Sequence, residues 1–423
     1  MWVCSRIEAE GCFLRRILVV DGGSLHAQNV ARQVRSLGVY SEIVPCSAAV
    51  EAVQGPDLRG IILVGMVSAR LEAVLGQTAV PVLSLDDRSP SEQVLESFLS
   101  KACGEIREWN MDNFLYQAVE KIRAQVGSGR AVCALSGGVD SAVAAVLVHR
   151  AIGDRLTCIY VDSGLMRAGE SQQVVETFRE GFGIPLVHVE AEERFLSKLA
   201  GVEDPEQKRR IIGIEFIRVF EEEAAKLGDV EFLVQGTLYP DVLESGVGQG
   251  DLVKSHHNVG GLPEDLRFKL VEPLAVLFKD EVRILGEKLQ IPQEILWRHP
   301  FPGPGLAIRV LGAVTKEKLV LLRQADAIVR EELHRSGWYH KIWQAAVVLT
   351  NMRAVGVQRG RRTYDYVVGL RFVSSVDGMS ADWVRVPYEL LDTIGRRLLG
   401  EVEGIGRVVY DISPKPPATI EWE

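Results

Sequence analysis

Paired cysteines and long apolar runs are both missing from this chain. It has six cysteines, which are scattered without a CxxC pair: Cys4, Cys12, Cys46, Cys103, Cys133 and Cys158. A zinc centre and a disulfide framework are therefore not expected, and the composition suits a reducing cytoplasm. No apolar run approaches the ~20 residues of a membrane-spanning helix. The first ten residues carry acids and lack the apolar segment of a signal peptide.

Two further features narrow the class of protein. The glycine-rich turn described below does not have the Walker sequence GxxxxGK[ST], so it is not the P-loop of a nucleoside triphosphatase. The formal net charge of -9 argues against general binding to nucleic acid. With 423 residues, 47% of them hydrophobic, the chain is long enough for two or three α/β domains.

The sequence SGGVDS over Ser136–Ser141 is the most informative stretch. It lies between an expected strand, 131–134, and an expected buried helix, 142–148. Gly137 and Gly138 allow close approach of a ligand to the backbone, and the helix N-terminus favours an anion. The serine hydroxyls add donors, and Asp140 is placed to hold Mg²⁺ against phosphates. The alternative is a plain glycine turn capped by Ser and Asp.

The first 105 residues alternate short apolar strands with helical patterns. Strands are expected over 17–21, 38–44, 60–64 and 80–85, with a helix over 27–37, so the sheet is parallel. This order resembles the start of a class I glutamine amidotransferase. In that family the last of these strands ends at a nucleophilic Cys, where this chain has Asp86, and no His-x-Glu pair follows in this region. We expect residues 1–105 to be a shortened, degenerate half-domain without glutaminase activity, which serves structure or docking.

Residues 106–300 continue with strands over 156–162, 184–189 and 232–237. His188 alternates with apolar neighbours and is interpreted as a core histidine. The basic group Lys208–Arg210 is either a solvated helix face or a ligand site. A polar, glycine-ended segment over 251–261 carries Lys254, His256 and His257 and is expected to close over phosphates as a lid.

Several long motifs occur together in one order. They read SGGVDS, YVDSGLMR, QGTLYPDVLES, KSHHNVGGLP, LVEPLAVLFKDEVR and RHPFPGPGL. In order and spacing they resemble the GMP synthetase family, whose members aminate XMP at the expense of ATP. The first motif resembles the pyrophosphate loop of the adenylating ATP pyrophosphatases. The resemblance runs from about residue 127 to the last residue.

Residues 301–423 begin with a Pro/Gly-rich linker over 301–305. Helices are expected over 316–336 and 388–403, and strands over 364–376 and 406–412. This α+β pattern resembles the dimerisation domain of the family. One departure is the stretch 357–362, where additional arginines replace the family's usual turn; the stretch 372–379 is also looser than the family pattern. The tail 415–423 is aromatic and rich in proline, and the resemblance implies that it folds into the nucleotide pocket.

The expected fold is thus α/β. An adenine-nucleotide α-hydrolase-like ATP pyrophosphatase domain (106–300) follows the flavodoxin-like remnant (1–105) and precedes a dimerisation and XMP-binding domain (301–423). The resemblance also implies roles for particular residues. ATP is assigned to Ser136, Gly137, Gly138, Val139, Asp140, Ser141, Val161 and Gly236, with Mg²⁺ on Asp140. XMP is assigned to Arg209, Arg210, Gln344, Arg407, Lys415, Ile420 and Glu421. The catalytic residues are Asp241, Glu244, Lys254, Lys279 and Asp280.

The resemblance implies a ligase that forms GMP from XMP through an adenyl-XMP intermediate, with ATP and Mg²⁺, and releases AMP and pyrophosphate. Ammonia, free or from a separate glutaminase subunit, replaces the chain's own glutaminase. A homodimer without nucleic acid or membrane is expected. Two alternatives stay open: a specialised paralogue that adenylates a related purine nucleotide for another nucleophile, and a non-catalytic nucleotide-binding partner.

Overall fold

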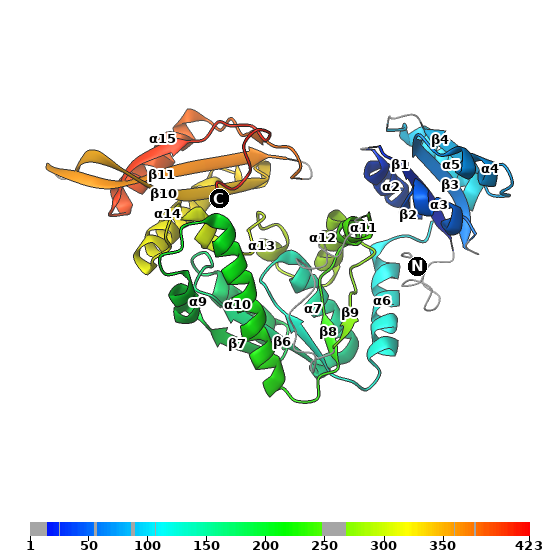
Figure 1. The fold of residues 1–423 in the computed structure, drawn as a ribbon, viewed down its shortest axis with the longest axis horizontal. Coiled ribbons are helices and arrows are strands. Elements are labelled where there is room, and N and C mark those ends of the chain that lie inside the picture. Colours follow the sequence, from blue (N-terminus) through cyan, green and yellow to red (C-terminus); the bar gives the residue numbers. More distant parts are fainter. Residues whose placement is uncertain are drawn as a thin grey trace. The chain divides into compact units, whose positions relative to one another are not determined.

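The computed structural model describes residues 15–24, 26–54, 57–85, 89–105, 107–247, 268–358, 360–375 and 378–423. The chain forms two compact units, and Figure 1 follows its path through them. Unit 1 comprises Met1–Gln125, Gly236–Gly260 and Glu272–Leu289. Unit 2 comprises Val126–Gln235, Gly261–Val271 and Gln290–Glu423.

Unit 1 is built on a parallel four-stranded sheet in the order β2-β1-β3-β4. Its elements are β1 Arg16–Gly22, α2 Ala27–Ser36, β2 Tyr40–Pro45, α3 Cys46–Ala52, β3 Leu58–Gly65, α4 Ala69–Leu75, β4 Val82–Leu85 and α5 Glu92–Cys103. The four expected strands and the parallel sheet are confirmed. Apolar side chains alternate along β1 toward two cores, one on each face of the sheet.

Three helices from later in the sequence belong wholly or mostly to the same unit. These are α6 Met111–Val126, α11 Tyr239–Val247 and α12 Lys279–Lys288. Tyr239 and Phe278 are buried in the core that α2 and α5 form over the sheet. The Tyr239 hydroxyl bonds to the backbone of Ile43 in β2. The division of the sequence at residue 105 does not anticipate this joint core.

Unit 2 contains a second parallel sheet in the order β7-β6-β5-β8-β9. Its strands are β5 Ala131–Ala134, β6 Leu156–Asp162, β7 Leu186–Glu190, β8 Phe232–Val234 and β9 Lys269–Val271. Its helices include α7 Val139–Ile152, α8 Glu170–Val175, α9 Glu192–Leu199, α10 Pro205–Lys226 and α13 Gln293–Leu296. The chain runs outward from β5 through β6 to β7 and then returns to β8. The strand order therefore reverses at the carboxyl end of β5, where open α/β sheets bind ligands.

The remainder of unit 2 is an antiparallel sheet with one parallel strand. Its strands are β10 Gln344–Gln358, β11 Arg361–Ser374, β12 Asp382–Trp383 and β13 Ile405–Tyr410. The helices α14 Lys316–Arg335 and α15 Tyr388–Glu401 accompany it, and a short 3-10 turn, η4, spans Gly305–Arg309. The two helices and strands β11 and β13 were expected from the sequence, whereas β10 was not. Figure 1 shows β10 and β11 as long paired strands, and the additional arginines Arg361 and Arg362 lie exposed at the start of β11.

Some sequence predictions fall outside the described residues. They concern the elbow residue Asp86, the lid residues Lys254, His256 and His257, and the side chain of Glu244. Within the described ranges, none of the helices combines the length and apolar character needed to cross a membrane.

Candidate functional site

The Ser136–Ser141 turn links β5 to the N-terminus of α7, as predicted. Gly137 has φ +77°, a left-handed conformation that a side chain disfavours. The Ser141 hydroxyl accepts from the Ser136 N–H at 3.2 Å and lies 3.0 Å from the Ser136 hydroxyl. It also donates to the Gly138 carbonyl at 3.1 Å. The serines thus hold the loop in shape before any ligand is bound.

Asp140 lies in the first turn of α7, next to this loop. Among the described residues there is no group of three or more His, Cys, Asp or Glu side chains that could hold a metal ion. Mg²⁺ bound to a nucleotide needs only one or two carboxylates, because the phosphates and water supply the other oxygen ligands. Binding of phosphate at this turn and of Mg²⁺ at Asp140 stays a prediction, for which a single carboxylate is sufficient.

The other residues assigned to ATP and catalysis are divided between the two units. Val161 is a buried residue near the end of β6 in unit 2, whereas Gly236, Asp241, Lys279 and Asp280 belong to unit 1. Asp241 accepts from the Leu238 N–H at 2.9 Å, so its carboxylate supports the start of α11. Lys279 and Asp280 open α12, and Asp280 is exposed, with Arg32 at 3.9 Å. That the assigned residues of unit 1 bind the same ATP molecule as the Ser136–Ser141 turn stays a prediction.

The tail of the sequence is bound along the C-terminal sheet of unit 2. The buried Arg371 guanidinium donates to the carbonyls of Ser413, Thr419 and Ile420 at 2.7–2.9 Å. The Trp422 indole covers Gly369, where a Cβ would stand 3.1 Å from the ring. A segment that would fray if it were free is therefore tightly held.

Glu421 is the centre of a polar cluster in this tail. The Arg309 guanidinium donates to its two carboxylate oxygens at 3.0 and 2.8 Å, and the Gln344 amide also donates to it. Burial lowers the pKa of Arg309, but the Glu421 carboxylate outweighs it, so that the pKa is raised overall. The sequence analysis named Gln344 and Glu421 but gave no role to Arg309, which ends η4 beyond the expected 301–305 linker.

The Lys208–Arg210 group divides into three different environments at the start of α10. Lys208 is fully buried, donates to the carbonyls of Ala307 and Val310, and pairs with Glu423. Burial lowers its pKa, against the effect of Glu423. Arg209 donates to the Glu423 carbonyl, whereas Arg210 is exposed. The interpretation as a solvated face therefore fits Arg210 only, and a ligand role for this basic group stays a prediction.

Three other residues assigned to XMP are placed as follows. Lys415 donates to the Gly378 carbonyl at 2.7 Å, and the Ile420 carbonyl accepts from Arg371. Arg407 is exposed on β13. The tail thus brings Gln344, Glu421 and Arg309 into contact with one another, and Arg209 into contact with Glu423.

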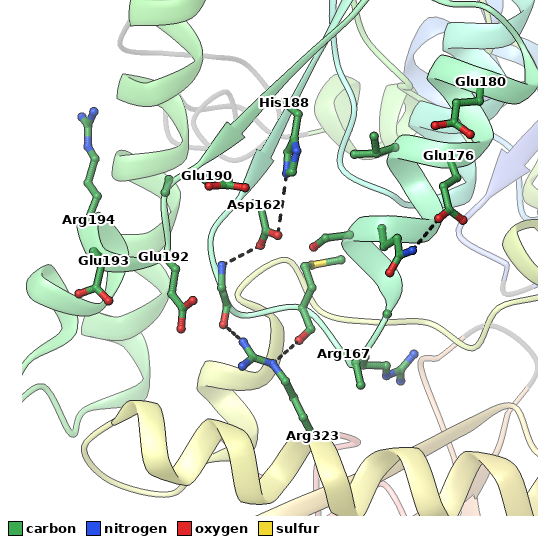
Figure 2. A pocket seen from close by; sticks show the side chains of 18 residues that line it. Asp162, Arg167, Glu176, Glu180, His188, Glu190, Glu192, Glu193, Arg194 and Arg323 are labelled. Carbon is green, nitrogen blue, oxygen red and sulfur yellow. Dashed lines mark hydrogen bonds and ion pairs between the residues drawn. The ribbon is translucent and has the colours of Figure 1, made fainter.

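A separate cleft of about 1090 Å³ lies at the carboxyl ends of β6 and β7. Figure 2 shows Asp162 and His188 facing each other there, and Arg323 reaching the loop after β6. Arg323 donates to the Met166 carbonyl at 3.0 Å. His188 is half-buried, with its Nε2 4.0 Å from the Asp162 carboxylate. The interpretation of His188 as a core residue is wrong, because its strand is an edge strand whose carboxyl end opens into this cleft.

Comparison with known proteins identifies two conserved domains. Residues 331–422 match the GMP synthase C-terminal domain, and residues 109–209 match NAD synthase. Two solved structures show a weak likeness. The NH3-dependent NAD synthetase from Campylobacter jejuni covers 54% of this chain and 87% of its own, with 15% identity and a TM-score of 0.34. The NMN synthetase from Francisella tularensis covers 55% and 93%, with 17% identity and a TM-score of 0.36.

Curated relatives are much more similar in sequence. A glutamine-hydrolysing GMP synthase from Carboxydothermus hydrogenoformans is 64% identical over 332 residues, which is 78% of this chain and 65% of the relative. Its counterpart from Heliobacterium modesticaldum is 61% identical over 331 residues, 78% of this chain and 64% of the relative. The chain thus spans somewhat less than two thirds of the length of these relatives. Residues 331–422 and 109–209 are thus similar to the GMP synthase C-terminal domain and to NAD synthase, and over the matched residues the chain is similar in sequence to the GMP synthases.

Proposed function

We propose that the chain catalyses the ATP-dependent amination of XMP to GMP, with release of AMP and pyrophosphate, and that it takes ammonia rather than hydrolysing glutamine itself. The observation that carries the proposal is the identity of 64% over 332 residues with a GMP synthase. The preformed Ser136–Ser141 turn and the bound tail around Glu421 support it, because a scaffold requires neither.

The reaction needs activation of a poor leaving group. In the proposed mechanism the 2-oxygen of XMP attacks the α-phosphorus of ATP, the bond between the α- and β-phosphates breaks, and pyrophosphate leaves. Ammonia then attacks C2 of the adenyl-XMP intermediate, and AMP leaves with the oxygen. Mg²⁺ beside Asp140 would supply charge stabilisation for the phosphates.

The chain's own residues contribute positioning and electrostatics. The backbone N–H groups and serines of the turn receive the pyrophosphate charge. Glu421, Gln344, Lys415 and Arg209 orient XMP. Lys254, Lys279 and the carboxylates of Asp241, Glu244 and Asp280 are proposed to serve the adenylation step. Water must be excluded, since it would hydrolyse the adenyl intermediate.

The first test mixes the full chain with ATP, Mg²⁺ and XMP, adds either ammonium or glutamine, and follows AMP and GMP. We expect both products with ammonium and neither with glutamine. AMP without GMP would favour a paralogue with another nucleophile, and no ATP cleavage with any purine nucleotide would favour the non-catalytic partner.

A matched pair of variants connects this activity to the turn. Gly137→Ala forces a side chain into a left-handed conformation, which costs about 1–2 kcal/mol, so we expect KM for ATP to rise about tenfold or more. Gly213→Ala, in the middle of α10 where an added Cβ would have no neighbouring atom within 4 Å outside its own helix turns, is the control and should leave KM unchanged.

A further inference from the structure

A row of buried charges of alternating sign runs through unit 2 from the phosphate turn to the tail. It begins with Arg298, which donates to the Gly137 carbonyl at 3.2 Å and lies 3.5 Å from the Glu170 carboxylate. Glu170 lies 3.6 Å from the guanidinium of Arg167 and also accepts from the Arg167 backbone N–H. These side chains are at most 10% exposed.

Asp326 of α14 connects this first half to the second. One of its oxygens lies 3.5 Å from Arg167, and the other lies 3.8 Å from Arg309. Arg309 in turn donates to both oxygens of Glu421. The Asp326 side chain is 2% exposed, and the two guanidinium groups that it separates are 2% and 0% exposed.

Phe301 lies against the same two guanidinium groups. The carbon centres of Arg167 and Arg309 stand 4.3 and 5.1 Å from its ring centroid. An aromatic face attracts a cation more strongly where water is excluded. The two neighbouring arginines therefore share one carboxylate and one ring, in addition to their separate partners Glu170 and Glu421. Asp326, which also accepts from Arg330 at 2.8 Å, supplies the negative charge between the two guanidinium groups.

We propose that Asp326 is a positioning residue that couples the ATP turn to the nucleotide site at Glu421, so that each nucleotide strengthens binding of the other. The proposal depends on the proposed function for the identity of the two sites. Charges in a dry interior interact strongly and are little screened by salt. When a bound purine forms hydrogen bonds with the Glu421 carboxylate, Arg309 interacts less with Glu421 and more with Asp326. The interaction of Asp326 with Arg167 then weakens. Through Glu170, this alters the position of Arg298 and its hydrogen bond to the Gly137 carbonyl.

The test measures a coupling factor by calorimetry on the full chain. The probes are XMP and α,β-methylene-ATP, which resists cleavage between the α- and β-phosphates. For the wild type we expect the Kd of each probe to fall about fivefold or more when the other is saturating, by the same factor in both directions. In Asp326→Asn the factor should fall to about one, while each Kd measured alone changes less than about threefold.

The matched control is Glu332→Gln. Glu332 is an equally buried carboxylate on the same helix, 2% exposed and paired with Arg397 at 2.7 Å, but it lies outside the row. It should retain the wild-type factor. If Asp326→Asn folds poorly, the double variant Arg167→Met/Asp326→Leu replaces the ion pair with apolar side chains, which buried sites often tolerate, and the same loss of coupling is expected.

The outcomes separate this proposal from the proposed function. Failure of XMP to bind would overturn both. Binding of both probes by the wild type without coupling, or undiminished coupling in Asp326→Asn, would overturn the role of Asp326 and leave the proposed reaction intact.

Discussion

His299 is held as a neutral ring inside unit 2. Its Nδ1 accepts from the Ala345 N–H at 3.2 Å, so the proton is on Nε2, which donates to the Tyr339 carbonyl at 2.7 Å. The ring stacks on Tyr339 with a centroid distance of 3.9 Å. Burial lowers the pKa of His299 to about 4. A second proton on this ring would remove the acceptor that Ala345 requires.

A pH-dependent loss of stability follows from this arrangement. The unfolded chain takes up a proton at this histidine near its ordinary pKa of about 6.5, whereas the folded chain does so only near 4. The stabilisation is therefore complete above pH ~6.5 and is lost as the pH falls toward 4, by up to about 3 kcal/mol. Urea unfolding at several pH values in this range should show the loss in the wild type and a shallower slope in His299→Gln.

The control is His149→Gln, a half-buried histidine of α7, which should keep the wild-type slope. An unchanged slope in His299→Gln would show that other groups cause the pH dependence.

At the scale of single residues, the sequence predicted those sites whose chemistry is local. The Ser136–Ser141 turn could be predicted because its glycines and serines are adjacent in sequence. Arg309 could not, since its partner Glu421 is more than a hundred residues away and nothing near Arg309 distinguishes a buried arginine from an exposed one. The burial of Lys208 could not be predicted for a similar reason, because a run of basic residues at the start of a helix is usually solvated.

At the scale of elements, helix α12 is joined to the N-terminal sheet through Arg35 of α2. Arg35 is 4% exposed and pairs with Glu281 at 2.7 Å. Its guanidinium also lies within 5.0 Å of the rings of Tyr40, Trp109, Tyr239 and Phe278. This one side chain holds together segments that lie far apart in the sequence.

The variant Arg35→Met tests this connection. It leaves the Glu281 carboxylate buried without its cation, which costs about 3–5 kcal/mol. We expect a lower unfolding temperature and faster hydrogen exchange in both α2 and α12. Arg32→Met is the control, because the partly exposed Arg32 also lies over the Phe278 ring, at 4.9 Å, but its carboxylate partner Asp280, at 3.9 Å, is exposed. Pairs with such exposure contribute about 1 kcal/mol or less. Unchanged exchange in α12 of Arg35→Met would contradict the role of Arg35.

The elements themselves were mostly predictable. The alternation of short apolar runs with helical patterns indicated β1 to β4, and the C-terminal α+β pattern included α14 and α15. Strand β10 was missed, since apolar and polar residues alternate less clearly over Gln344–Gln358. Its pairing with β11 is a tertiary contact that the local sequence does not show. The grouping of α11 and α12 with β1 to β4 was also missed, because no local pattern shows which core a buried Tyr239 or Phe278 will enter.

At the scale of the whole molecule, the proposed use of ammonia would distinguish this chain from relatives named as glutamine-hydrolysing. The residues after β4 are the acidic Asp86 and Asp87, at the position where the resemblance to class I glutamine amidotransferases predicts a cysteine. Of the described cysteines, Cys46 begins α3, Cys103 ends α5, Cys133 lies in β5 and Cys158 lies in β6, so none of them stands directly after β4.

Direct use of ammonia makes the rate depend on pH. At a fixed total concentration of ammonium, GMP formation should rise with pH in proportion to free NH3, because only the unprotonated form is a nucleophile. Rates measured at several pH values and replotted against free NH3 should then fall on one curve. AMP formation with XMP alone, in single turnover, controls for pH effects on adenylation. Rates that follow total ammonium instead would contradict direct capture of NH3.

The shared core of unit 1 also constrains how the gene can change. Tyr239 and Phe278 are 1% and 0% exposed within a core that residues 17–103 otherwise build, and burying such a side chain contributes about 1.5–3 kcal/mol. Deleting the N-terminal segment would expose both rings at once and leave Glu281 without Arg35. Loss of the N-terminal segment would therefore require several residues in or next to α11 and α12 to change together, whereas a single substitution is enough to remove one catalytic side chain.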